Sequence, residues 1–86
     1  MSLRIAWSTR AQRELTEITW QDAAWICAEV ARYAEHGTGD VRRTLLSTGA
    51  SAPVLFLPGF RVLLAYDRAT RELWVLSVYR PPARRT

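Results

Sequence analysis

The N-terminal half of the chain has the pattern of a short strand followed by two helices. Residues 3–7 alternate apolar and polar side chains, which predicts a β-strand. Apolar residues then recur every three or four positions, which predicts a first helix over about 10–19 and a second one directly after it. Thr9 and Thr19 stand at the expected N-caps, and Gly37 is expected to end the second helix in the left-handed conformation. This half is therefore predicted to be a strand followed by a helical hairpin.

The C-terminal half changes to the alternation typical of strands. The predicted strands lie at residues 40–46, 54–57, 60–67 and 72–80. Helices that precede a run of hairpin-linked strands indicate an α+β fold. We expect an N-terminal strand, a helical hairpin and then an antiparallel sheet of about four strands, with the helices on one face. With 86 residues, the chain is expected to form a single domain over residues 1–86.

The last two strands carry two arginines whose relative position depends on the strand register. A short loop joins the strands, so that Asp67 is expected to face Glu72. The same regular register, continued to the other end, pairs Arg61 with Val78 and places Arg80 diagonally from Arg61 on the same face. Like charges so placed repel each other unless an anion lies between them. The pair is therefore either a phosphate clamp or two arginines that are solvated or paired with carboxylates.

This hairpin is apolar on both faces, although two helices can cover only one of them. An exposed apolar patch on a small protein often marks a partner site. The second face is therefore predicted to bind a partner through Leu63, Trp74, Leu76 and Val78. The alternative is that loops or residues 81–86 cover it.

The charge of the chain favours an anionic partner. All twelve basic residues are arginines, against eight acidic residues, which gives a net charge of +4. Such a balance suggests nucleic acid or an acidic protein as the ligand. Arginine holds phosphate in a bidentate fork but cannot act as a general base. Arg42 and Arg43 are candidate contacts to nucleic acid, with a solvated strand edge as the alternative.

Several other classes of protein are disfavoured by the sequence. One cysteine and one histidine, Cys27 and His36, offer no ligand cluster, so we expect no metal and no cofactor. A single cysteine cannot form an internal disulfide, which fits a cytoplasmic protein. Cys27 falls on the apolar stripe of the second helix and is expected in the core. No apolar run is long enough for a transmembrane helix, and no membrane partner is expected.

The motifs, taken in order, resemble the RelE/ParE toxins of type II toxin–antitoxin systems. The resemblance covers residues 3–80. It is carried by a strand ending in Trp7, by Thr9-Arg10-Ala11-x-x-x-Leu15, by Gly39-Asp40-Val41-Arg42-Arg43, by Pro58-Gly59-Phe60-Arg61-Val62-Leu63 and by a final strand ending in Arg80.

The resemblance implies a toxin that a cognate antitoxin neutralises and that meets operator DNA only through that antitoxin. In the ribosome-dependent mRNA endonucleases of the family, basic residues hold the messenger and stabilise the charged phosphorane. By this resemblance Arg61 and Arg80 would be catalytic, and Arg42 and Arg43 would bind RNA. The chain departs from the pattern because no tyrosine or histidine follows Arg80, which leaves the general acid and base unassigned.

Two further interpretations stay open. The ParE branch shares the fold and inhibits DNA gyrase without nuclease chemistry. A degenerate toxin could instead act as an antitoxin-binding corepressor. The basic surface favours RNA, whereas the missing proton-transfer group favours the other two.

Overall fold

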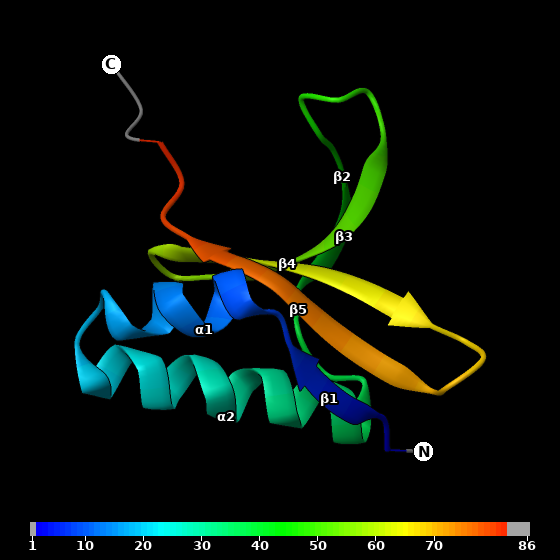
Figure 1. Cartoon of the computed structure of the whole chain (residues 1–86), viewed down its shortest axis with the longest axis horizontal. Helices are drawn as coiled ribbons and strands as arrows, with labels where there is room; N and C mark the ends of the chain where they lie inside the picture. Colours follow the sequence, from blue (N-terminus) through cyan, green and yellow to red (C-terminus); the bar gives the residue numbers. More distant parts are fainter. Residues whose placement is uncertain (1, 83–86) are drawn as a thin grey trace.

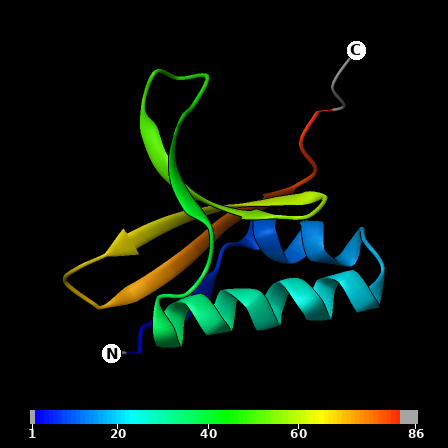
Figure 2. The same ribbon diagram turned by 180° about the vertical axis from the view of Figure 1, so that it is seen from behind.

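The computed structural model describes residues 2–82 and shows a five-stranded sheet with both helices on one face (Figures 1 and 2). Residues 83–86, the end of the segment considered above as a cover, lie outside the described residues. The elements are β1 (Arg4–Trp7), α1 (Thr9–Thr16), α2 (Trp20–His36), β2 (Val41–Leu45), β3 (Ser51–Leu57), β4 (Phe60–Asp67) and β5 (Glu72–Tyr79). The strand order is β1-β5-β4-β3-β2. The predicted α+β fold is therefore confirmed, and the N-terminal strand joins the sheet as a fifth strand, parallel to β5.

Two of the three predicted helix caps are confirmed, and α1 ends at Thr16, earlier than predicted. Thr19 accepts a hydrogen bond from the amide of Asp22, and Gly37 ends α2 with a φ of 71°. The N-cap of α1 is Ser8, not Thr9, because the Ser8 hydroxyl accepts from the amide of Ala11. α1 therefore begins one residue earlier than a cap at Thr9 would allow, directly after the parallel strand β1.

The core lies between the two helices and the sheet, and it includes Ala11 of α1. Ile26, Val30 and Ala34 form the buried stripe of α2. They belong to the same apolar cluster as Val62 and Val75 from the centre of the sheet. The prediction for Cys27 is wrong, because this residue is exposed. It follows Ile26 directly, and one residue turns the helix by about 100°, away from the buried stripe. None of the helices within residues 2–82 is both long and apolar enough to cross a membrane.

Strand β3 begins at Ser51, whereas the prediction started it at residue 54, after Pro53. A proline lacks the amide proton that a central strand needs. Here β3 pairs with β4 only from Val54 onward, whereas at Pro53 its one neighbour is β2. At this end β2 and β3 bend away from the helices as a projecting hairpin (Figure 1). The proline therefore occupies a stretch where the strand has an unpaired side.

A register shift in β5 decides which side chains reach each face of the sheet. Pairing is regular from Asp67–Glu72 to Leu64–Val75, and Leu76 is then left without a partner. Beyond this bulge the pairs are Leu63 with Ser77, Val62 with Val78, and Arg61 with Tyr79. The regular register predicted above is therefore wrong at this end. Val78 lies in the core at 4% exposure, not on a partner surface.

Candidate functional site

Arg61 lies on the face of the sheet opposite the helices, next to Phe56 of the neighbouring strand. The two residues pair across β3 and β4, and the guanidinium carbon of Arg61 lies 4.2 Å from the ring centre. Nη1 of Arg61 donates to the main-chain oxygens of Leu57 and Phe60, at 3.0 and 2.8 Å. These bonds use the two protons of Nη1, so Nε and Nη2 stay available for a ligand. Arg61 is thus held by the protein and still able to bind an anion.

Arg42 reaches the same ring from the other neighbouring strand. Its guanidinium carbon lies 4.4 Å from the centre of the Phe56 ring. Asp40 holds Arg42 with two bonds, Nε to Oδ1 at 2.9 Å and Nη2 to Oδ2 at 2.8 Å. The hydrogen bonds and charge of Arg42, with the charge of Arg61, hold the pKa of Asp40 below its ordinary value of 3.8. Phe56 is thereby flanked by two cations, one of them already paired with a carboxylate.

Arg80 does not share this face with Arg61, so the predicted pairing of the two is wrong. The bulge shifts the register by one residue and turns Arg80 toward the other side. There its guanidinium carbon lies 4.5 Å from the centre of the Phe60 ring, which packs edge-on against Trp25 of α2. The two arginines therefore rest on aromatic rings of opposite sides, near the turn between β3 and β4. A single phosphate between them does not follow from this arrangement.

Tyr79 is a site residue that the regular register concealed. It pairs with Arg61 and is 37% exposed. Directly paired side chains lie about 4.5–5.5 Å apart at Cβ. Among residues 2–82 no group forms a hydrogen bond with its hydroxyl. The family pattern has a tyrosine or histidine after the position of Arg80, whereas in this chain the bulge brings the tyrosine before Arg80 to the open face.

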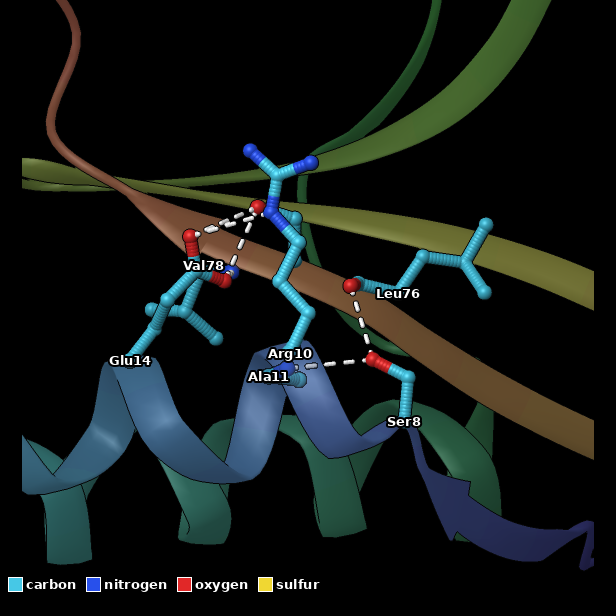
Figure 3. A network of polar contacts seen from close by, with 7 residues as sticks. Ser8, Arg10, Ala11, Glu14, Leu76 and Val78 are labelled. Carbon is cyan, nitrogen blue, oxygen red and sulfur yellow. Dashed lines mark hydrogen bonds and ion pairs between the residues drawn. The ribbon is translucent and has the colours of Figure 1, made fainter.

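The bulge is held by contacts from α1 (Figure 3). The Ser8 hydroxyl donates to the main-chain oxygen of Leu76 at 2.8 Å. The carboxylate of Glu14 accepts from the Val78 amide at 2.9 Å and from the Ser77 hydroxyl at 3.0 Å. Nε of Arg10 lies 3.5 Å from Oε2 of Glu14 and forms an ion pair with it. β1 ends at Trp7, so these side chains satisfy the edge of β5 where no strand is left to pair with it.

The two adjacent arginines of β2 reach different environments. Arg42 is on the open face, as its contact with Phe56 shows. Arg43 instead lines a pocket on the helix side of the sheet, together with Leu64 and Leu73. Successive residues of a strand point to opposite faces, so this separation follows from their spacing. The expected common RNA contact through both residues is not supported by this placement.

The predicted partner patch is present in part. Leu63 and Trp74 are half-buried on the open face, and Leu76 at the bulge is 36% exposed. Trp74 pairs with Ala65 of β4 and Ala6 of β1, both small residues that leave the indole accessible. With Val78 in the core, three of the four residues stay candidates.

The described part of the chain offers no metal site. Within residues 2–82 there is no group of three or more histidine, cysteine or acidic side chains that could hold an ion. Although Cys27 is exposed, neighbouring atoms partly desolvate its thiol and raise its pKa from the ordinary value of 9.0.

No protein-family model and no curated protein sequence matches the chain. Among solved structures, a chain in the crystal structure of the toxin–antitoxin complex RelBE2 from Mycobacterium tuberculosis is similar, with a TM-score of 0.76. The two chains are 14% identical, and the match covers 94% of this chain and 100% of that one. The likeness is one of fold, and it agrees with the family that the order of motifs resembles. The chain thus has a RelE-like fold.

Proposed function

We propose that this chain is the toxin of a type II toxin–antitoxin module and cleaves messenger RNA on the ribosome. The observation that supports the proposal most is the arrangement around Arg61 on a RelE-like sheet. The guanidinium of Arg61 is fixed beside the ring of Phe56, and Arg61 stands opposite the exposed Tyr79 in the register of β4 and β5. Arginine binds phosphate, and the exposed ring of Tyr79 can stack on an unpaired base, whereas the Phe56 ring is already flanked by two guanidinium groups. The surface is therefore suited to single-stranded RNA.

The proposed reaction is attack by a ribose 2′-hydroxyl on the adjacent phosphate. A bond forms between the 2′-oxygen and phosphorus, and the bond from phosphorus to the 5′-oxygen breaks. The free N–H groups of Arg61 stabilise the additional negative charge of the phosphorane. The 2′-proton passes to solvent water, the phenol of Tyr79 protonates the leaving 5′-oxygen, and the phenolate so formed takes a proton back from water. Arg80 lies over Phe60 on the other side of the sheet and has no role in this step.

The test is induced expression of the chain and of the variants Arg61→Ala and Tyr79→Phe. We expect the unchanged chain to stop translation and leave new 5′ ends in messenger RNA. Loss of one such donor typically lowers a rate by roughly 10²–10³, so Arg61→Ala should relieve growth inhibition. Tyr79→Phe keeps the ring and removes the hydroxyl, so it separates proton transfer from stacking. Folded variants that remain fully toxic would contradict the assignment.

Inhibition of DNA gyrase is the second candidate, because one feature of Arg61 favours a structural role. Its two bonds to Leu57 and Phe60 brace the turn between β3 and β4 and require no nuclease chemistry. Under this alternative, loss of DNA supercoiling precedes any loss of translation, and messenger RNA stays intact. Timing both processes after induction therefore separates the two functions.

The proposed partner is an antitoxin, in keeping with the RelBE2 structure, which is that of a toxin–antitoxin complex. An antitoxin segment that packs on Leu63, Trp74 and Leu76 would cover the open face and exclude RNA from Arg61. The net charge of +4 suits an acidic segment. A corepressor role would rest on the same contacts.

A further inference from the structure

A pocket of about 350 Å³ lies on the side of the sheet away from Arg61, where the end of α2 meets the sheet. Its floor is formed by the aliphatic side chains of Ala34, Leu64 and Leu73, which are at most 3% exposed. Tyr33 and Tyr66 line it as well, and Arg43 is its charged residue. Pockets for small molecules span about 300–1,000 Å³, so this one is of a size for one bulky side chain or a small ligand.

Arg43 is the feature that selects a ligand for this pocket. Its neighbour Arg42 is neutralised by Asp40, whereas Arg43 forms no ion pair with any residue between 2 and 82. Over the same range the hydroxyls of Tyr33 and Tyr66 have no hydrogen-bond partner. The pocket thus combines an apolar floor with one unpaired cation and two free hydroxyl donors. These features match a ligand that has an apolar body and a carboxylate beside it.

The end of α2 fixes which way such a ligand would lie. Gly37, the C-cap of α2, also lines the pocket, and a helix C-terminus carries a partial negative charge. A carboxylate at that side is unfavourable, whereas at Arg43 it gains a partner. The apolar body therefore belongs over Leu64 and Leu73, and the carboxylate at the β2 side.

We propose that this pocket binds a bulky apolar side chain of an acidic protein segment, with Arg43 pairing a carboxylate next to that side chain. The identity of the partner as the antitoxin rests on the proposed function, but the chemistry of the site does not. The pocket lies on the other face from Arg61, so its occupant anchors the partner without touching the proposed RNA site. RNA is a poor occupant, since the floor of the pocket is aliphatic and Arg43 is the only cation that the described residues contribute to its lining.

The experiment uses blocked tripeptides and two-dimensional amide NMR spectra of the full chain. The probe is acetyl-Asp-Phe-Glu-amide. The first control, acetyl-Asn-Phe-Gln-amide, removes the charges, and the second, acetyl-Asp-Gly-Glu-amide, removes the apolar side chain. We expect the probe to shift the amides of Ala34, Gly37 and Leu73 saturably, and each control to bind at least about threefold more weakly, in the range of an exposed ion pair or more.

Two neighbouring variants make a matched pair for this titration. Arg43→Gln should weaken binding of the probe about threefold or more, and Arg42→Gln should leave it unchanged, because its side chain is on the other face. Equal effects of the two variants would indicate general attraction by charge and overturn the proposal. Shifts of the same amides by a uridine trinucleotide would overturn it in favour of RNA. Only binding is measured, so a chain that proves non-toxic leaves this result standing.

Discussion

The guanidinium carbon of Arg61 lies 4.2 Å from the centre of the Phe56 ring, while its Nη1 donates to two main-chain oxygens. Arg61→Ala removes the ring contact and both bonds from a half-buried position. We expect the free energy of unfolding to fall by about 1–2 kcal/mol, the size of such contacts. Urea unfolding would measure it, and an unchanged midpoint would show that the contacts contribute nothing. The activity of this variant should therefore be assayed at a temperature where it is folded.

The pKa of Asp40 should depend on its neighbour. Arg42 lowers this pKa below 3.8 through hydrogen bonds and charge. We expect Arg42→Ala to move it back toward 3.8 in an NMR titration of the carboxyl carbon. Since the folded pKa is the lower one, the carboxylate favours the folded state above pH 3.8, and this contribution is lost as the pH falls through the folded pKa. A pKa that does not rise in the variant would show that the pair is open in solution.

Glu14 should be essential for the register of β5. Its carboxylate accepts bonds from Val78 and Ser77, and Glu14→Ala leaves the partly buried Val78 amide without an acceptor. An unsatisfied buried donor costs about 1–3 kcal/mol, which is the expected loss of stability. Hydrogen exchange provides a sharper measurement, because the Val78 amide should lose protection while the amides of α2 keep theirs. Glu14→Gln, which retains an acceptor oxygen, is the control and should protect Val78 better than alanine does.

Leu76 and Val78, two positions apart in β5, test the bulge directly. Val78 is 4% exposed and pairs with Val62, whereas Leu76 is 36% exposed and unpaired. Val78→Ala should destabilise the protein by about 2 kcal/mol, since each buried methylene contributes about 0.8 kcal/mol and a cavity adds to the loss. Leu76→Ala should cost well under half as much. Thermal or urea unfolding decides, and the reverse ranking would restore the regular register.

The extent of the sequence prediction follows from how local each signal is. The caps at Thr19 and Gly37, the loop that pairs Asp67 with Glu72, and the alternation along β4 are set by neighbouring residues, and the structure confirms them. The order of these elements was enough to predict the fold. The bulge is instead contacted by Glu14, which is more than sixty positions away from Ser77. No local pattern encodes such a contact.

One shifted residue accounts for most of the differences at the candidate site. It moved Val78 into the core, turned Arg80 to the Phe60 side and brought Tyr79 next to Arg61. The edge of β5 beyond the short strand β1 needs hydrogen-bond acceptors, and Glu14 is the residue of the sequence that provides them. The separation of Arg42 from Arg43, by contrast, follows from strand alternation alone.

Trp74 should contribute a large part of the affinity for the partner. It lies on the open face between small residues, half-buried and still accessible, and tryptophans in such positions are common binding hot spots. We expect Trp74→Ala to weaken the complex with the antitoxin of the same module by about 2 kcal/mol or more, measured by calorimetry. Trp20 is the matched control, because it is 75% exposed at the start of α2, away from this face. Its replacement by alanine should change neither binding nor stability.

The apolar contact should govern dissociation and the charges association, so added salt should slow association more than it hastens dissociation. An equal loss in both tryptophan variants would place the partner elsewhere and remove the reason to expect that it excludes RNA from Arg61.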